Sequence, residues 1–438
     1  MSKLVVEVCQ ISKVSPHPNA DKLDVIQVKG WDTIISKGTF KTGDKCIFFP
    51  PDSVLQPELY NSPNDPITPG RLNNSNYLKT LPTDFEGNKP SGKRVTACRL
   101  RGSVSYGLAI PLDLNYGDLD WDVGTDVSEF FKVTKYEPPV ESVMGECEKF
   151  NSRFYPYKSI EHYANFTDLF QDQEEVIFTE KVHGTNSRVG LILEPDSTGH
   201  SQWTYAAGSH SVRRKELSNI ETRILASKLE EKNIKILKKD DVSYFKDENG
   251  IFWMINQEIP SDIGMKYQVV QVNSDFELIK RKSDYWLPLT ENMKNLLNYL
   301  KDNFKTEETM HSIMIYGEIY GFGVQDMCYG LNCKSYKAFD IAINNIYLDY
   351  DYQIELFNKF DIEVVPVLYR GPFSQEKVKE FTTGPTTICD TKNAGKFKGR
   401  EGIVIKSVIE NKMFNKPRKI AKSVSADYLS RENGTEFH

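Results

Sequence analysis

The residues best suited to chemistry lie in one short turn, Glu180-Lys-Val-His-Gly-Thr-Asn186. A lysine attacks a phosphate only when its amine is neutral and held in line, which requires a cation-rich or desolvated site. Gly184, three residues after Lys181, lets the backbone approach a nucleotide closely because it has no side chain. A lysine and a glycine at this spacing are common, and an ordinary surface lysine is the alternative. The turn therefore has to be judged by the motifs that accompany it.

Four further motifs follow the turn in order: Tyr316-Gly-Glu-Ile-Tyr-Gly321, Ala338-Phe-Asp-Ile341, Glu401-Gly-Ile-Val-Ile-Lys406 and Arg418-Lys-Ile-Ala-Lys422. Each one alone has a structural explanation, for example Phe339 as a core residue or Glu401 at the head of an amphipathic strand. The last two lie within residues 391–438, which contain 11 Lys/Arg against 5 Asp/Glu in a chain of net charge −6. A local basic stretch on an acidic protein indicates an anion site rather than a general nucleic-acid coat.

The five motifs, in this order over roughly 240 residues, resemble the covalent nucleotidyltransferases, which include polynucleotide ligases and mRNA capping enzymes. The Lys-x-His-Gly-Thr-Asn form of the first motif is similar to RNA ligases, whereas Lys-x-Asp-Gly is usual in the other groups. An OB-like domain before the motifs and the C-terminal pattern around 422–429 and 434–437 narrow the likeness further. The chain is similar to the nick-sealing RNA ligases of the Deinococcus and Naegleria type, over nearly its whole length except about 217–280.

This resemblance implies ATP-dependent RNA ligation in three steps. Lys181 would attack the α-phosphate of ATP to form lysine–AMP, AMP would pass to an RNA 5′-phosphate, and a 3′-hydroxyl would displace it. The partner would be RNA with 3′-OH and 5′-phosphate ends in a nicked duplex. The cofactors would be ATP and Mg²⁺ or Mn²⁺, because the charge on the reacting phosphates must be offset. Two alternatives are a GTP-using capping guanylyltransferase, which would carry its OB domain after the catalytic domain, and a non-catalytic RNA-binding protein.

The resemblance also implies roles for individual side chains. Glu318 would accept hydrogen bonds from the ribose hydroxyls, and Phe339 would stack on adenine. Glu401 would hold the divalent metal, directly or through water. Lys419 and Lys422 would be catalytic cations that neutralise phosphate charge. The other nucleotide-binding positions belong to the first motif: Glu180, Val182, Gly184 and Asn186.

Two motifs depart from the family pattern. The last motif is usually Lys-x-Lys, whose alternation places both amines on one strand face. Here it is Lys419-Ile-Ala-Lys422, which makes Lys422 the stronger match. The arginine motif, commonly Gly-Ser-Arg, is Gly208-Ser-His210 in this chain, and either Arg213 or Arg214 is the alternative arginine.

The first ~135 residues are predicted to form short strands separated by turns. Five short strands in a small domain favour an OB-type barrel, with a barrel that binds no ligand as the alternative. The segments 15–23 and 101–108 resemble tRNA-binding-type OB domains. Candidate phosphate contacts are Lys93, Arg99 and Arg101. The strand-forming runs are 4–14, 24–35, 44–55, 93–102 and 106–112.

Beyond a Pro/Glu-bearing connector the pattern mixes strands with helices. Thr290 is expected to cap a helix over 290–300, whose apolar residues recur at helical spacing, and strands are predicted at 175–179, 313–316, 338–343 and 402–407. The 137 residues between Lys181 and Glu318 exceed the family spacing, so about 217–280 is predicted to be an insertion. Within it, 221–239 is predicted to be helical and 245–253 to form a hairpin.

The predicted fold class is therefore α+β, with three parts. Residues 1–135 would form a five-stranded OB-like barrel and residues 136–148 a linker. Residues 149–438 would form an ATP-grasp-like, DNA-ligase-type nucleotidyltransferase domain of antiparallel sheets with flanking helices. Because the motifs lie between 180 and 422, residues from about 150 onward are predicted to contain everything that lysine–AMP formation needs.

Composition excludes several other classes. The 438 residues, at 50.2 kDa, indicate two or three domains, and 39% hydrophobic with 26% charged residues excludes disorder or a fibrous repeat. No run approaches the ~20 apolar residues of a membrane helix, and the start lacks a secretory signal. Seven cysteines without a Cys-x-x-Cys pair are predicted to be reduced thiols. We expect a soluble cytoplasmic or nuclear monomer that does not bind membranes.

Overall fold

The computed structural model of this chain contains sheets in three regions and few helices. No helix in its described part is long and apolar enough to cross a membrane, and all seven cysteines are free thiols. The boundaries predicted at 135 and 148 stay predictions, because 137–146 lie outside the described residues, as do 434–437. The described residues are 4–57, 59, 77–81, 91–112, 121–136, 147–196, 198–210, 212–224, 237–239, 242–246, 252–255, 267–272, 276–306, 309–389, 395, 397–411 and 418–431.

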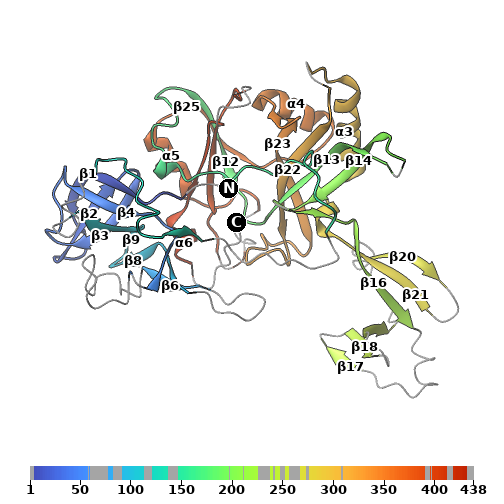
Figure 1. Cartoon of the computed structure of the whole chain (residues 1–438), viewed down its shortest axis with the longest axis horizontal. Coiled ribbons are helices and arrows are strands. Elements are labelled where there is room, and N and C mark those ends of the chain that lie inside the picture. The colour runs from blue at the N-terminus through green and yellow to red at the C-terminus, as the bar shows by residue number, and fades with distance from the viewer. Residues whose placement is uncertain are drawn as a thin grey trace.

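The N-terminal part is a barrel built on a five-stranded antiparallel sheet (Figure 1). Its order is β10-β4-β1-β2-β3, and apolar side chains on both faces of β1 enter two separate cores. The strands of this sheet are β1 (Glu7–Pro16), β2 (Leu23–Val28), β3 (Trp31–Ser36), β4 (Lys45–Phe49) and β10 (Leu108–Pro111). A second sheet contains β11 (Thr134–Lys135), β5 (Ser53–Leu55), β7 (Lys93–Val95) and β6 (Leu78–Thr80), and β8 (Cys98–Leu100) pairs with β9 (Ser103–Ser105).

Three of the predicted runs are each divided into two strands, so the prediction of single strands was wrong there. Run 24–35 is the β2–β3 hairpin, in which Val28 pairs with Trp31 and Lys29 takes a left-handed φ of 53°. Lysine rarely adopts this conformation, so Lys29 is not a residue type that predicts such a turn. Run 44–55 breaks after β4 at two prolines, which cannot donate to a sheet. Run 93–102 becomes β7 and β8.

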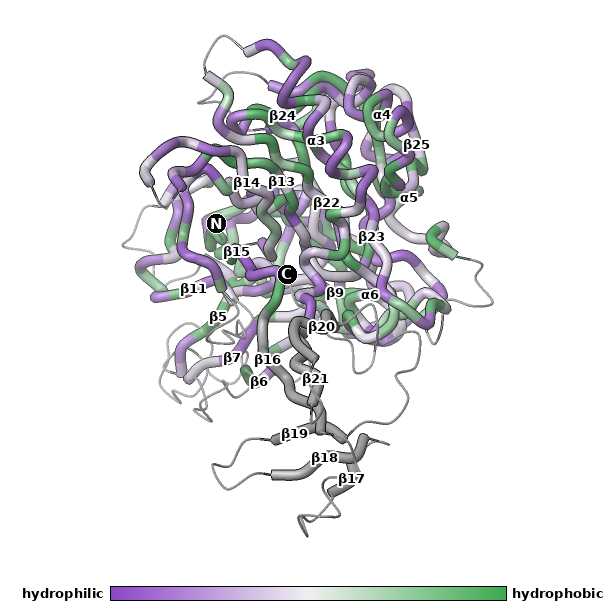
Figure 2. The backbone as a smooth tube through the Cα atoms, turned by 90° about the vertical axis from the view of Figure 1, so that its right-hand side faces the viewer, coloured by the Kyte–Doolittle hydropathy of each residue, from purple (hydrophilic) through white to green (hydrophobic). Residues whose placement is uncertain are grey.

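Two antiparallel sheets form the body of the larger part. One has the order β25-β12-β26-β27 and the other β15-β14-β13-β22-β23-β24. Figure 2 shows hydrophobic residues gathered along the central strands β13 and β22. The strands predicted at 175–179, 313–316, 338–343 and 402–407 are all present. The ten strands are β12 (Glu175–Lys181), β13 (Thr185–Pro195), β14 (Ser201–Gly208), β15 (Arg213–Arg214), β22 (Ser312–Gly321), β23 (Lys334–Ile343), β24 (Ile346–Tyr347), β25 (Val367–Pro372), β26 (Gly402–Ser407) and β27 (Ile420–Val424).

Helices cover the outer side of these sheets. The helix predicted at 290–300 is α3 (Glu291–Asn303), capped by the Thr290 side chain, which accepts a hydrogen bond from the Met293 N–H. Its apolar face packs into the core over β22 and β23, together with α4 (Tyr350–Lys359). The other helical elements with described bounds are α5 (Gln375–Thr382), α6 (Ala426–Leu429) and the 3-10 turns η1 (Tyr163–Asn165) and η3 (Asp284–Trp286).

The predicted insertion forms a third sheet that projects away from the main body (Figure 1). Its order is β17-β18-β19-β16-β21-β20, and the hairpin predicted at 245–253 is present as β18 and β19. The helix predicted at 221–239 was wrong where the chain is described, because Ile220, Thr222 and Ile224 alternate with charged residues and β16 pairs with β21. The strands are β16 (Leu217–Ile224), β17 (Leu237–Lys239), β18 (Val242–Lys246), β19 (Phe252–Ile255), β20 (Tyr267–Val272) and β21 (Phe276–Lys282).

The barrel is seated on the larger part through the β2–β3 turn. The Trp31 indole N–H donates to the Asn165 side-chain oxygen at 2.7 Å, and its ring lies 4.2 Å from the ring of His162. The Gly30 N–H donates to the Ala164 carbonyl at 2.9 Å. A Cβ on Gly30 would lie only 2.7 Å from the Ala164 Cα, so the two backbones meet without room for a side chain.

Replacing Gly30 with valine is expected to destabilise this contact by about 1–3 kcal/mol, the usual cost of forcing extra atoms into a packed site. The Gly30 backbone is not left-handed, so lack of space is the cause. Urea unfolding followed by tryptophan fluorescence should show a lower midpoint. Ser36→Val, at the exposed end of β3, is the matched control and should leave the midpoint unchanged. Equal midpoints for Gly30→Val and wild type would contradict this account.

Candidate active site

Lys181 is the last residue of β12, and strand pairing brings Glu401 beside it. Lys181 pairs with Gly402 at the start of β26, so the preceding residue, Glu401, stands next to the lysine. The Lys181 amine donates to Glu401 Oε1 at 2.5 Å, and the Glu401 side chain is 2% exposed. The antiparallel pairing of β12 with β26 thus holds the predicted nucleophile, Lys181, against the buried carboxylate of Glu401.

The turn after Lys181 carries the chain onto the second sheet. There β13 pairs with β22, and Asn186 stands directly opposite Glu318. A Cβ on Gly184 would lie 2.2 Å from the Ile319 carbonyl oxygen. The close approach that requires glycine is therefore to strand β22, and any side chain here would push the turn off the sheet.

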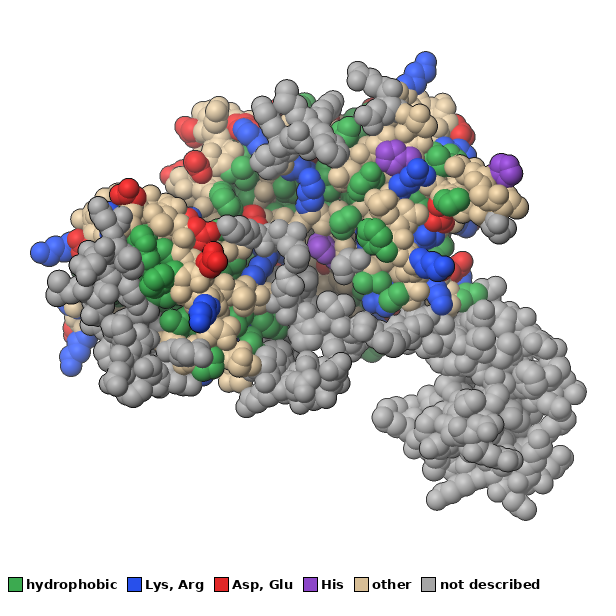
Figure 3. Space-filling model, in the orientation of Figure 1, with side chains coloured by type: hydrophobic (Ala, Val, Ile, Leu, Met, Phe, Trp, Pro, Cys, Tyr) green, Lys and Arg blue, Asp and Glu red, His purple; other side chains and the backbone are tan. Residues whose placement is uncertain are grey.

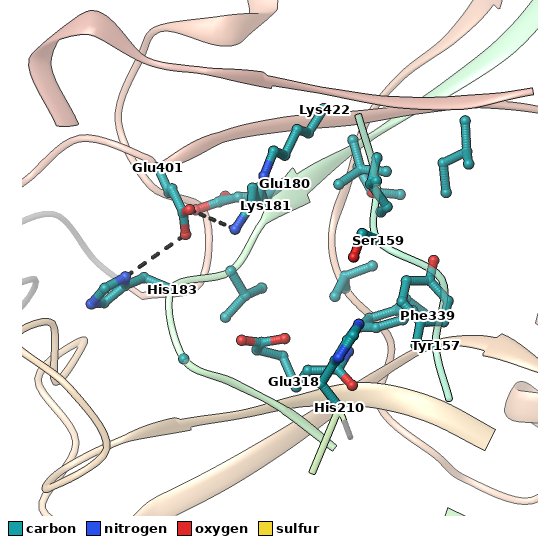
Figure 4. A pocket seen from close by; sticks show the side chains of 18 of the residues that line it. Tyr157, Ser159, Glu180, Lys181, His183, His210, Glu318, Phe339, Glu401 and Lys422 are labelled. Atoms are coloured by element: carbon teal, nitrogen blue, oxygen red, sulfur yellow. Dashed lines mark hydrogen bonds and ion pairs between the residues drawn. The ribbon is translucent and has the colours of Figure 1, made fainter. Parts of the chain in front are cut away.

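The two sheets enclose a cavity of about 410 Å³, within the range of small-ligand pockets. Figure 4 shows Lys181, Glu401 and Lys422 on one side and Glu318 with His210 across from them. Apolar side chains form part of the wall, and a planar base could lie against them. They are Ile160, Val182, Phe339, Val365, Val404 and Ile420.

A buried ionic network fixes the ring of Phe339 in this wall. Asp340 accepts hydrogen bonds from Lys406 at 2.9 Å, Arg418 at 3.1 Å and the Tyr157 hydroxyl at 2.6 Å. The two cations hold the pKa of the Asp340 carboxyl well below its usual range, against the effect of burial. Lys406 also donates to the Phe339 carbonyl at 2.8 Å. The ring is therefore placed by its backbone and by Tyr157, whose ring centroid is 5.0 Å away.

Glu318 and Asn186 present polar groups to the cavity. Burial raises the pKa of Glu318 to about 8, with Lys181 opposing the shift and Glu401 adding to it. The side-chain oxygen of Asn186 is buried and accepts no hydrogen bond from the described residues. Buried polar groups without partners are costly, so this wall is suited to a ligand that carries hydroxyl groups or positive charge.

Glu318→Gln is expected to stabilise the ligand-free protein at pH 8 by several degrees in Tm and to have little effect near pH 5. Between its ordinary pKa of 4.5 and about 8, the Glu318 carboxyl is ionised when unfolded but protonated when folded. Its cost to stability therefore rises with pH across that window, whereas glutamine carries no such cost. Thermal unfolding in EDTA at both pH values measures the difference, and a difference independent of pH would contradict the assignment.

The structure separates the two lysines of the last motif. Lys422 lies in β27 opposite Val404 and lines the cavity, as does Ile420 two residues earlier. Lys419 faces the other way, and its amine pairs with Glu174 at 2.7 Å, outside the cavity. Strand alternation explains the separation, because residues three apart lie on opposite faces. Burial, together with the charge of Lys181, lowers the pKa of Lys422 to about 8.

His210 lines the cavity. It is the third residue of Gly208-Ser-His210, the position at which the family pattern commonly has an arginine. Neither alternative arginine lines the cavity: Arg213 pairs with Glu194 at 2.9 Å, and Arg214 lies over the Tyr285 ring. Arg188 instead holds the segment that carries His210, because its side chain donates to the carbonyl of the neighbouring Ser209 at 2.7 Å. Burial, with the nearby charge of Arg188, lowers the pKa of His210.

The side chain of Glu180 does not serve the cavity. Its carboxylate is buried and accepts hydrogen bonds from the Thr386 hydroxyl at 2.5 Å and from the Thr387 N–H at 2.7 Å. It thus anchors the loop before β26, and Glu180 also borders the cavity beside Val182.

Sequence reasoning missed several cavity residues, among which two groups stand out. One is the segment 157–160, which has no recognisable motif. The other comes from the barrel, where β5 pairs with β11 and brings Asp52, Lys135 and Tyr136 to the cavity. Asp52 pairs with Arg94 at 2.6 Å. The barrel therefore contributes to the walls of this cavity, and the sufficiency of residues from about 150 onward for lysine–AMP formation stays a prediction.

The candidate phosphate contacts on the barrel stay predictions, and the structure shows where two of them lie. Arg99 is bound to Asp427 and donates to the Ser430 hydroxyl at 3.0 Å, so it ties the barrel to α6. Arg101 remains exposed. On the face seen in Figure 3, positive and negative side chains are interspersed over the described surface, which argues against a broad basic coat.

Comparisons with known proteins agree with this architecture. A family model described as RNA ligase matches residues 174–424, and an OB-fold domain model matches residues 5–112. The solved structure of Naegleria gruberi RNA ligase with PPi is 19% identical, with a TM-score of 0.60 over 98% of each chain. A mutant of that enzyme with ATP and Mn is 19% identical, with a TM-score of 0.61 over 97% of this chain and 98% of that one.

Another mutant of the Naegleria enzyme, with AMP and Mn, is 20% identical, with a TM-score of 0.60 over 97% of this chain and 98% of that one. At this identity the likeness supports the fold alone. A search of curated protein sequences finds no match. The ligase model covers more than half of the chain, including all five motifs, and this chain belongs to the RNA ligase family.

Proposed function

We propose that this protein is an ATP-dependent RNA ligase that joins RNA 3′-OH and 5′-phosphate ends in nicked duplexes, through lysine–AMP and AMP–RNA intermediates. The observation that carries the proposal is the convergence of Lys181, Glu401, Glu318 and Lys422 on one nucleotide-sized cavity between two sheets. The fold is similar to that of an RNA ligase solved with ATP, AMP and Mn, which supports the same nucleotide here.

In the first step the cavity would orient ATP for attack by Lys181. Adenine would lie against Phe339, and the ribose hydroxyls would bond to Glu318 and to the unpartnered oxygen of Asn186. The Lys181 nitrogen would form a bond to the α-phosphorus while the bond to pyrophosphate breaks. Lys422 shares the same buried space, and two like charges there disfavour protonation of both amines. This favours the neutral, nucleophilic form of one of them.

The carboxylates of this cavity fit a divalent metal. Glu401 and Glu318 both face it, and hard cations prefer such oxygen ligands. In the described part of the chain no three His, Cys, Asp or Glu side chains gather as a complete metal site. Bound Mg²⁺ or Mn²⁺ would offset phosphate charge, with water and phosphate oxygens completing its shell.

Incubation with α-labelled ATP or GTP tests the proposal. We expect ATP, and not GTP, to give an acid-labile protein adduct when Mg²⁺ or Mn²⁺ is present. The same preparation should seal a nicked duplex with an RNA 3′-hydroxyl, acting as a monomer, because one chain supplies both barrel and cavity. Labelling by GTP would instead favour a capping enzyme, and no labelling would favour an RNA-binding protein without activity.

A further inference from the structure

The histidine of the nucleophile turn has a partner on each ring nitrogen. His183 Nε2 lies 2.8 Å from Asp326 Oδ1, and Nδ1 lies 2.7 Å from the Tyr428 hydroxyl. The ring is only 3% exposed. The backbone N–H of His183 donates to the Tyr329 hydroxyl at 2.8 Å. Both the ring and the backbone of this residue are therefore held.

One tautomer satisfies every group in this chain of contacts. Asp326 is an acceptor, so Nε2 carries the proton and donates it, which leaves Nδ1 to accept from the Tyr428 O–H. Arg431 completes the chain by donating to Asp326 Oδ2 at 3.0 Å. With both nitrogens engaged, His183 is not available as a base toward a nucleotide.

This series of contacts lies directly beside the groups that would react. His183 is two residues from Lys181, and its Nδ1 is 3.8 Å from Glu401 Oε2 (Figure 4). Tyr428 belongs to α6, which begins directly after Ser425, and the Ser425 N–H donates to the Glu401 carbonyl at 2.7 Å. Helix α6 thus contacts the nucleophile turn through the Tyr428 side chain. Its N-cap residue, Ser425, contacts the backbone of Glu401.

We infer that Tyr428 is a positioning residue for lysine adenylylation, acting through His183 to hold Lys181 and Glu401 in register. This inference rests on the proposed function and adds α6 to the machinery of its first step. The Tyr428 hydroxyl bonds to His183 Nδ1 and would thereby orient the nucleophile turn, and Tyr428 also borders the cavity.

Tyr428→Phe removes only the hydroxyl and is the sharpest test. The single-turnover rate of lysine adenylylation should fall about tenfold or more, because small misplacements of reacting groups are costly, while the KM for ATP stays near wild type. Tyr369→Phe is the matched control. It loses a comparable hydrogen bond, to the Pro372 carbonyl at 2.8 Å, on β25 and away from the cavity, and should adenylylate normally.

The tautomer of His183 can be measured by spectroscopy, which tests the inference without an activity assay. ¹H–¹⁵N NMR of histidine-labelled protein should show the Nε2–H tautomer for His183 at neutral pH, assigned with His183→Gln. The Nδ1–H tautomer or a charged ring would overturn the inference, as would a wild-type rate for Tyr428→Phe. If Tyr428→Phe does not fold, Asp326→Asn tests the other end of the chain and should also slow adenylylation. A wild-type protein that never labels would contradict the proposed function instead.

Discussion

Lys181→Ala should show no covalent labelling by ATP. The amine of Lys181 stands at the end of β12, 2.5 Å from Glu401, and faces the cavity that would hold the nucleotide. Alanine has no side-chain nitrogen to form the phosphoramidate bond with AMP, so the loss of labelling should be complete rather than partial. Labelled ATP with denaturing gel electrophoresis measures it.

Lys419→Ala is the matched control for this loss. Lys419 also pairs with a glutamate, Glu174 at 2.7 Å, but outside the cavity, so labelling should be retained. Lys181→Ala should still seal RNA that already carries AMP on its 5′-phosphate, because that substrate bypasses the amine. Labelling of the Lys181→Ala protein would place the nucleophile elsewhere, and failure to seal adenylylated RNA would give Lys181 a further role.

The sequence predicts best those parts of the fold in which local periodicity and burial agree. Helix α3 has a capping threonine and four apolar residues at helical spacing, and all four are buried. The strands around the motifs are apolar runs bounded by polar turns. In the insertion, by contrast, Lys and Glu suggested a helix, whereas the alternation of Ile220, Thr222 and Ile224 matches the strand that forms.

The sequence motifs predicted which residues belong to the site. They did not predict which of these residues are neighbours or which way their side chains face. Strand register places Lys181 beside Glu401 and Asn186 opposite Glu318, and no single motif contains that information. Lys419 matched a motif by type, yet the strand turns it outward.

Contributions from distant segments were beyond sequence reasoning. Asp52 and Lys135 reach the cavity only because β5 pairs with β11 in the barrel. Tyr428 reaches the nucleophile turn only because α6, which follows β27, packs against that turn. Such contacts depend on how complete elements pack, and residue types alone carry no signal for them.

Glu401→Gln should slow lysine adenylylation by about 10²–10³, the usual effect of removing one preorganised electrostatic group from a reacting centre. The Glu401 side chain is 2% exposed, pairs with Lys181 and lies 3.8 Å from His183. Glutamine preserves the shape but removes the charge that holds the amine and attracts a metal. Rapid-quench measurement of the adduct, repeated over a range of Mn²⁺ concentrations, gives the rate.

Glu174→Gln is the matched control, because it removes the charge of a glutamate that also pairs with a lysine, Lys419, but lies outside the cavity. We expect it to adenylylate at the wild-type rate and to unfold near the same temperature. The metal series separates two roles of Glu401. If high Mn²⁺ restores the rate of Glu401→Gln, the carboxylate acts mainly by binding the ion. If the rate stays low, its contact with Lys181 dominates, and a wild-type rate at every concentration would show that Glu401 takes no part in the first step.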